Sequence, residues 1–126
     1  MLKAFALAPL QENPRGKFVV ISDGQNLHVV LGPVNRYAYH ANIVFAYTEE
    51  AGRAHASLDG SGLCHLLTPG WKVLGGGQYR LDDLTHTLKF SEKSTAYGKY
   101  PIEKLRALRD ELPNAFGLMH WDLDLI

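Results

Sequence analysis

Two parts of this chain combine residue types that could bind or transfer an anionic group. The first runs from Lys89 to Pro101, where an apolar alternation predicts a strand, the small-residue loop Ser94–Gly98 follows, and a helix begins at about Pro101. A helix start leaves backbone N–H groups without partners and carries partial positive charge, so phosphate or carboxylate binds there readily. Together with Lys89, the side chains of Lys93 and Lys99 add positive charge. This stretch predicts an anion-binding loop, and an ordinary strand-to-helix connection with solvated lysines is the alternative.

The second candidate is His40, which follows Tyr39 at the predicted start of another helix. A side chain in that position can project into a cleft, and a histidine with a pKa near neutral can act as an acid, a base or a nucleophile. A structural or merely exposed histidine is the alternative. The other histidines are scattered, without H-x-x-x-H spacing, and so we expect no metal ion. The chain also lacks the glycine patterns of nucleotide-binding loops and the G-x-S-x-G motif of serine hydrolases.

The length and composition describe one soluble globular domain, which we place over residues 1–126. Hydrophobic residues make up 46% and charged residues 21% of the chain. A domain of this size buries roughly two-thirds of the surface that its unfolded chain exposes, enough for a core without disulfide or metal. Thirteen basic and thirteen acidic residues cancel, so we expect neither nucleic acid nor a membrane as a partner. Between Arg80 and Arg109, however, seven Lys/Arg face four Asp/Glu, which makes any anion affinity local.

Cys64 is the only cysteine, which excludes an internal disulfide and favours a reducing compartment. In its apolar surroundings, a buried structural thiol is the preferred interpretation and an activated nucleophile the alternative. No apolar run approaches the length of a membrane span, and the N-terminus lacks the pattern of a signal peptide. We therefore expect a cytoplasmic protein, and a monomer.

The first half of the chain predicts a hairpin followed by a helix. Leu2–Leu10 predicts either a short first strand or a loosely held arm. Lys17–Ser22 and Leu27–Leu31 are rich in β-branched and apolar residues on either side of a turn at residues 23–26, which is typical of a hairpin. A dense apolar stretch then predicts a helix from about Tyr39, with a strand over Ile43–Tyr47 as the alternative.

The middle of the chain predicts a loop and a second hairpin. Residues 52–70 are expected to form a surface loop with one short element around Leu63–Leu67. A strand over residues 71–81 contains Gly75–Gly77. Close packing of a helix across the sheet is the preferred interpretation of these glycines, and a bulge or a close approach of backbone is the alternative. Thr85–Phe90 is predicted to return antiparallel to it.

The C-terminal part predicts a helix and a last strand. An apolar stripe predicts a helix over Pro101–Leu112, ended by residues 113–114. Phe116–Trp121 is predicted as a strand, with Asp122–Ile126 as an acidic tail. The chain as a whole predicts an α/β (α+β) fold, with a single mixed β-sheet of about six strands flanked by two helices.

Three short motifs resemble those of one known family, in the same order along the chain. Tyr39–Ile43 reads Y-H-A-N-I, Leu74–Gln78 reads L-G-G-G-Q and Ser94–Gly98 reads S-T-A-Y-G. They are similar to the Y-H-A-D-I, L-G-G-G-R and S-M-A-Y-G of the phosphohistidine phosphatase family, also called the Janus family. The resemblance extends to Gly16–Val19 and to residues 112–121, and so covers nearly the whole chain apart from residues 52–70, which are longer than in the animal phosphatases.

The resemblance implies a hydrolase that removes phosphate from phosphohistidine in proteins, without a metal ion or another cofactor. His40 matches the catalytic histidine, which would act as a general base on water or as a nucleophile. Ser94, Thr95 and Ala96 match the loop whose backbone N–H groups and serine hydroxyl hold the phosphoryl oxygens. Lys17 matches the lysine that neutralises those oxygens. The substrate would be a phosphorylated protein or a small phosphoramidate.

The chain departs from the family pattern at three positions. Gln78 stands in place of arginine, which removes a cation from the substrate-binding set. Asn42 replaces an aspartate that could orient the catalytic histidine, and Thr95 replaces a methionine. Two alternatives to a hydrolase therefore stay open. One is a non-catalytic module that binds phosphate or a phosphoprotein, and the other is a structural protein that keeps the motifs only for its fold.

Overall fold

The computed structural model describes residues 1–126 and confirms a mixed α+β fold. Six strands form one mixed sheet in the order β1-β3-β2-β6-β7-β8, and two more form a separate hairpin, β4-β5. The strands are β1 Leu2–Ala6, β2 Arg15–Ser22, β3 Leu27–Pro33, β4 Ala56–Leu58, β5 Cys64–Leu66, β6 Lys72–Asp82, β7 Thr87–Ser91 and β8 Asp122–Leu125. The helices are α1 His40–Phe45, continued by a π-helical turn at Ala46–Glu50, then α2 Ile102–Arg106 and α3 Leu112–Ala115.

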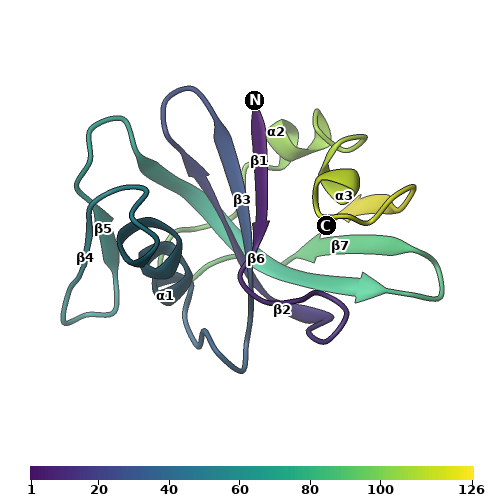
Figure 1. The fold of residues 1–126 in the computed structure, drawn as a ribbon, viewed down its shortest axis with the longest axis horizontal. Coiled ribbons are helices and arrows are strands. Elements are labelled where there is room, and N and C mark those ends of the chain that lie inside the picture. Colours follow the sequence, from purple (N-terminus) through teal and green to yellow (C-terminus); the bar gives the residue numbers. More distant parts are fainter.

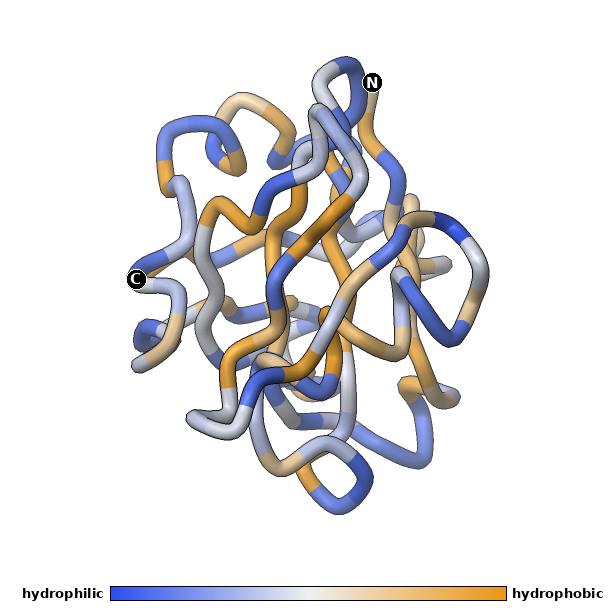
Figure 2. Tube along the Cα trace, turned by 90° about the vertical axis from the view of Figure 1, so that its left-hand side faces the viewer, coloured by the Kyte–Doolittle hydropathy of each residue, from blue (hydrophilic) through white to orange (hydrophobic).

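The large sheet separates two hydrophobic cores. Side chains alternate along a strand, so Phe18 and Val19 of β2 point to opposite faces. Phe18 belongs to the core under α2 and α3, where it stacks on Phe90, and Val19 belongs to the core under α1. Figure 1 shows α1 and the β4-β5 hairpin on one side of the central strands and α2 and α3 on the other. Figure 2 shows apolar residues concentrated in the central strands and hydrophilic residues in the outer loops.

The predicted N-terminal hairpin is present, and the first strand is part of the sheet. β2 and β3 pair antiparallel, and β1 pairs parallel with β3, so residues 2–6 form a strand rather than a loose arm. In the turn, the Asp23 carboxylate accepts the N–H groups of Gln25 and Asn26. The same carboxylate is 2.8 Å from Nε2 of the buried His28, which ties the turn to β3. The turn chemistry recognised in the sequence thus fixes the register of the hairpin.

The glycine run in β6 forms an irregular strand that approaches other backbone closely. The pairing of β2 with β6 shifts in register at Gly75: Val20 pairs with Gly75, whereas Ile21 pairs with Val73. Gly75 has a φ of +148°, and a Cβ on it would lie 2.2 Å from the carbonyl oxygen of Lys99. The bulge and the close approach of backbone, which were the alternative interpretation of the glycines, are therefore both present. Gly75 lets the segment that follows the 94–98 loop lie against β6.

Two predictions for the C-terminal part are wrong in their boundaries. The predicted single helix over residues 101–112 is divided into the short helices α2 and α3, with turns between them. Pro113 does not end a helix but lies in the first turn of α3, where its fixed φ is well tolerated. The predicted strand over residues 116–121 consists of turns, in which Gly117 and His120 have positive φ. The predicted tail instead forms β8, because its Asp-Leu-Asp-Leu alternation turns Leu123 and Leu125 to the core.

Residues 52–70 contain a β-hairpin where one short element was expected. β4 and β5 pair antiparallel over three residues each and add a second sheet to the predicted one. No helix in the protein is both long enough and apolar enough to cross a bilayer.

Candidate functional site

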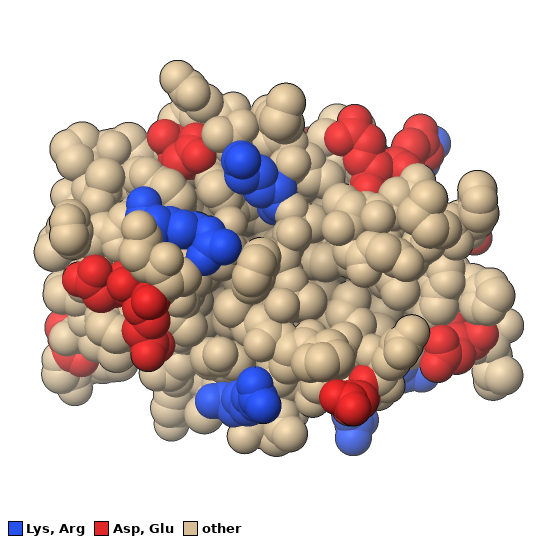
Figure 3. Space-filling model, viewed as in Figure 1, with Lys and Arg blue, Asp and Glu red and all other residues tan.

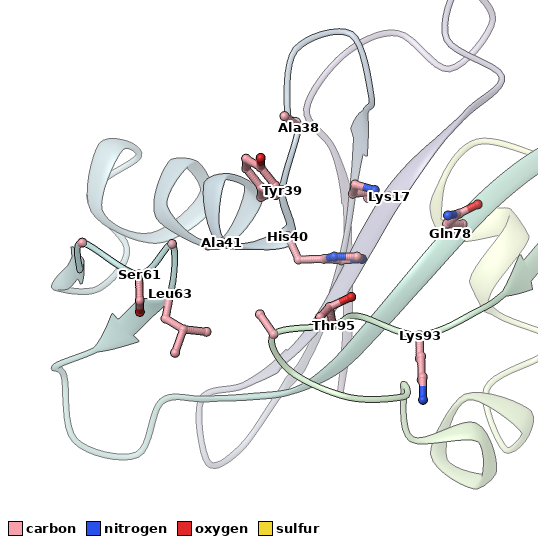
Figure 4. A pocket seen from close by; sticks show the side chains of 13 residues that line it. Lys17, Ala38, Tyr39, His40, Ala41, Ser61, Leu63, Gln78, Lys93 and Thr95 are labelled. Carbon is pink, nitrogen blue, oxygen red and sulfur yellow. The ribbon is translucent and has the colours of Figure 1, made fainter.

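A hollow of about 760 Å³ opens where the start of α1 meets β2, β6, the tip of the β4-β5 hairpin and the 94–98 loop. Five of the six residues predicted for the site line it: Lys17, His40, Gln78, Thr95 and Ala96. These residues come from four separate segments of the chain. Figure 4 shows the His40 side chain running from the start of α1 across the hollow, between Lys17 on one side and Thr95 on the other.

Ser94 is the predicted site residue that does not line the hollow. It is buried, and its hydroxyl accepts the N–H of Tyr97 at 3.1 Å. Its own N–H donates to the carbonyls of Gly76 and Gly98. Ser94 therefore shapes the loop and fastens it to β6, and its hydroxyl oxygen is already engaged within the loop.

The next two residues of the loop leave their N–H groups free. Neither Thr95 nor Ala96 donates its backbone N–H to any acceptor in the chain, and both residues are exposed. Successive backbone N–H groups in a turn form a small concavity that favours an anion. Lys17 lines the same hollow, so its ammonium group can act together with these two N–H groups on a phosphoryl group.

The helix start predicted at about Pro101 is present, but it does not line the hollow. α2 begins at Ile102, after an extended segment in which Lys99 pairs with Gly76, and none of its residues lines the hollow. Lys99 also donates from Nζ to the carbonyl oxygen of Ile126 at 2.8 Å, away from the hollow. Of the three lysines around the loop, Lys93 alone lines the hollow, and in Figure 4 its side chain points away from His40. The loop's positive character thus comes from its own N–H groups and from Lys17.

One hydrogen bond fixes the orientation and the tautomer of His40. Its Nε2 is 2.9 Å from the carbonyl oxygen of Gly77, and because a carbonyl only accepts, Nε2 carries the proton. The ring lies against β6 at Gly76, where a Cβ would be 3.0 Å from the ring's Cδ2. Nδ1 has no hydrogen-bond partner in the chain. Because no buried side-chain nitrogen or oxygen is left without a partner, Nδ1 is not buried and is open to the hollow. The glycine run thus seats the ring and leaves a basic nitrogen facing a ligand.

The surroundings of His40 favour its neutral form. Burial lowers the pKa of His40, the hydrogen bond to Gly77 opposes that effect, and the positive charge of Lys17 lowers the pKa further. The net shift is downward from 6.5, so the imidazole is neutral at pH 7. A neutral imidazole with Nδ1 unprotonated can accept a proton or attack phosphorus.

Asn42 acts on the helix rather than on His40. Its Oδ1 accepts the backbone N–H of Tyr39 at 3.2 Å, which caps the first turn of α1. The orientation of His40 comes instead from Gly77. An aspartate at position 42 could make the same cap, so the difference from the family motif falls on the helix start.

Gln78 lies directly beside Lys17 on the neighbouring strand. The two residues are paired across β2 and β6, and both line the hollow. An arginine at position 78 would place a second cation next to Lys17. With glutamine there, Lys17 is the one cation of this cross-strand pair.

The tip of the β4-β5 hairpin forms a wall of the hollow that we did not predict. Residues 60–63 line it, and Figure 4 shows Ser61 and Leu63 on the side opposite Gln78. Asp59 holds this tip: one carboxylate oxygen accepts the Ser61 and Leu63 N–H groups and the Ser61 hydroxyl. Hydrogen bonds from Ser61 and His65 hold the pKa of Asp59 well below its usual range. The D-G-S-G sequence of residues 59–62 is a turn signal, but it does not indicate what the turn approaches.

Tyr97 connects the hairpin to the 94–98 loop. Its hydroxyl donates to the carbonyl of Cys64 and accepts the N–H of the same residue, both at 2.9 Å. Cys64 itself is buried, and burial raises the pKa of its thiol to about 11. This environment is typical of a structural thiol rather than of a nucleophile, in line with the preferred interpretation of the sequence.

Replacement of Tyr97 by phenylalanine should destabilise the protein by about 1–2 kcal/mol, since it leaves two backbone groups of Cys64 unpaired. We expect a lower urea midpoint and faster hydrogen exchange at the Cys64 amide. Tyr37→Phe is the matched control, because that ring packs on the same core and its hydroxyl makes no hydrogen bond. Unchanged exchange at Cys64 in Tyr97→Phe would show that the connection is not formed.

No group of three or more His, Cys, Asp or Glu side chains lies together in a way that could hold a metal ion. In comparisons with known proteins, no family model matches this chain, and no curated protein matches it.

Proposed function

We propose that this chain is a cytoplasmic, metal-independent phosphohydrolase that acts on phosphohistidine in proteins or on a small phosphoramidate. The supporting observation is the neutral imidazole of His40, open at Nδ1, in one hollow with Lys17 and the free N–H groups of Thr95 and Ala96. The motif resemblance to the phosphohistidine phosphatases points to the same activity.

Binding would use the donors that the chain leaves unpaired. Two phosphoryl oxygens would accept the N–H groups of Thr95 and Ala96, and Lys17 would neutralise charge on the oxygens that face β2. Phosphoryl transfer needs mainly positioning and stabilisation of charge on these oxygens, which backbone donors and one ammonium group supply.

The chemical step would use Nδ1 of His40. As a general base, Nδ1 takes a proton from water while the water oxygen bonds to phosphorus. The P–N bond to the substrate imidazole breaks, and the leaving nitrogen takes a proton from bulk water. As a nucleophile, Nδ1 itself bonds to phosphorus and displaces the substrate imidazole, which takes a proton from bulk water, and a second water then cleaves the new P–N bond. In both routes Gly77 holds the Nε2 proton and keeps Nδ1 directed at the hollow.

The deciding assay is phosphate release from a peptide that carries chemically phosphorylated histidine, measured against spontaneous hydrolysis. We expect many turnovers per molecule of protein. Release no faster than the spontaneous rate would exclude the proposed activity. Alkaline quenching separates the two routes, since a phosphorylated His40 survives alkali and would be found only if Nδ1 is the nucleophile.

A phosphate-binding module without catalysis is the second candidate, favoured by Gln78 beside Lys17. With only one cation in this pair, the site can hold a phosphoryl group and supply less charge to a transition state. This candidate predicts that a phosphopeptide binds and shields Thr95 and Ala96 amides from exchange, while no phosphate is released.

Replacement of Lys17 by methionine should lower kcat/KM for phosphohistidine peptide by about 10- to 100-fold, since it removes a charge-assisted contact worth about 1.5–3 kcal/mol. It should also displace the acid limb of the pH profile. His40 must be neutral to act, and Lys17 lowers its pKa. Without the charge of Lys17 the pKa of His40 rises, so on acidification the variant loses activity at a higher pH than the wild type does. Lys93→Met is the control and should leave the acid limb in place; an identical limb in Lys17→Met would contradict the assignment.

A further inference from the structure

A second, smaller concavity of about 320 Å³ adjoins the candidate site and shares Lys17 and Gln78 with it. Three more cations line it: Arg15, Arg80 and Lys89. Strand pairing arranges these side chains in two parallel rows across β2, β6 and β7. The inner row is Lys17, Gln78 and Ser91, and the outer row is Arg15, Arg80 and Lys89.

The two rows lie on the face of the sheet that α1 covers only in part. Arg15 and Lys17 alternate with buried residues and share their face with Val19, which packs in the core under α1. α1 lies over the other end of β2, so the end with the cations stays open. Arg15 and Arg80 are exposed, and Lys17 is half-buried.

The outer row places three cations side by side without an ion-pair partner in the chain. None of its three cations takes part in an ion pair. Like charges directly opposite each other on neighbouring strands are destabilising. Charged residues often protect the edge of a sheet from pairing with other chains, but β2, β6 and β7 are interior strands of this sheet. The row therefore holds like charges side by side without protecting an edge, as expected of a binding surface.

Acidic residues bound this surface on its far side. Asp124 lies beside Lys89 on β8, and Asp82 follows Arg80 by two residues on β6. Burial raises the pKa of Asp82, but hydrogen bonds from Thr85 and Leu84 and, to a smaller extent, the charge of Arg80 lower it. Positive charge thus continues from the candidate site to the outer row and ends there.

We propose that the outer row binds carboxylates of the substrate protein close to its phosphorylated histidine. The inference rests on the proposed function. Adjacent strands are about 4.8 Å apart, and the two rows are separated by two residues along β2, or about 7 Å. An extended peptide covers that distance in about two residues. With the phosphoryl group at Lys17, carboxylates two to three residues away along the substrate would reach Arg15, Arg80 and Lys89.

The observations favour an acidic peptide over nucleic acid. The chain has a net charge of zero and a pI of about 7.0, whereas nucleic-acid-binding domains are strongly basic. Beyond the two rows, the signs are mixed: Figure 3 shows one face with small groups of both charges around an uncharged middle. The surface itself offers three cations in one short row, a match for a few carboxylates.

The test uses a fluorescein-labelled peptide with a non-hydrolysable phosphohistidine analogue, flanked on both sides by glutamates two and three residues away, and a second peptide with glutamines instead. At low salt we expect the wild-type protein to bind the glutamate peptide about tenfold more tightly than the glutamine peptide. The variant R15Q/R80Q/K89Q should lose this preference. The variant K3Q/K72Q/K104Q removes the same charge from exposed sites elsewhere and should keep it.

Equal affinity of the wild type for the two peptides would overturn the inference, as would a preference that survives in R15Q/R80Q/K89Q. A single-stranded RNA that binds the wild type more tightly than the glutamate peptide, and loses affinity in that variant, would also overturn it.

Hydrolysis of a small phosphoramidate distinguishes a failure of this inference from a failure of the proposed function. That rate should be equal in the wild type and in R15Q/R80Q/K89Q. If neither the wild type nor R15Q/R80Q/K89Q hydrolyses the phosphoramidate while the wild type still prefers the glutamate peptide, the proposed activity is refuted and the binding surface is supported.

Discussion

Replacement of His40 by alanine should lower the rate of phosphate release from a phosphohistidine peptide by about 10²- to 10⁴-fold, the usual contribution of a positioned acid–base group. The reason is that Nδ1 of His40 is the one basic nitrogen with a fixed orientation in the hollow, held by the bond from Nε2 to Gly77. Binding of the peptide should change little, because the proposed phosphoryl donors are Lys17, Thr95 and Ala96. The loss should therefore appear in kcat.

The control for this variant is His55→Ala, since the side chain of His55 is 81% exposed and lies outside the hollow. It should keep the full rate. Urea unfolding of both variants will show whether the loss of the His40 ring also loosens β6, against which it packs. Added imidazole should restore part of the rate in His40→Ala if the missing group is the base. Equal rates in the wild type and in His40→Ala would refute the role of His40.

The sequence predicted the parts of the site that depend on local pattern. The helix start at His40, the hairpin that carries Lys17 and the small-residue loop at 94–98 are each visible as a change of periodicity or a turn signal within a few residues. The resemblance led us to expect them in one site, and the sheet order, in which β2 lies next to β6, brings Lys17 beside Gln78. The irregular strand at Gly75 was also predictable, because glycine is the residue that tolerates positive φ and close backbone approach.

The parts that the sequence did not predict depend on contacts between distant residues. Tyr97 reaches Cys64 across 33 positions, and this contact holds the hairpin beside the site. The Ser94 hydroxyl was expected to face a ligand, whereas the loop itself uses it to bind the Tyr97 N–H. The C-terminal strand was misplaced because residues 116–121 contain apolar side chains typical of a strand, while parallel pairing with β7 selects the alternating residues 122–125.

Replacement of Gly75 by alanine should lower the free energy of unfolding by about 3–5 kcal/mol, a large part of the stability of a domain of this size. Two effects add. Gly75 has a φ of +148°, which an L-residue adopts at a cost of about 1–3 kcal/mol. The new Cβ would also lie 2.2 Å from the Lys99 carbonyl oxygen and 2.7 Å from its carbon, so one backbone segment must move.

This movement would act on the candidate site as well as on stability. The displaced segment follows the 94–98 loop, which is fastened to β6 by the bonds between Ser94, Gly98 and Gly76. A shift there separates the N–H groups of Thr95 and Ala96 from His40, so phosphate release should fall even in the protein that remains folded. Gly60→Ala is the matched control, because its Cβ would meet no atom within 4 Å and its φ is not positive. We expect its urea midpoint to equal that of the wild type. Equal urea midpoints for Gly75→Ala and Gly60→Ala would show that β6 does not approach Lys99 as closely as described. The three glycines would then serve only to make room for the His40 ring.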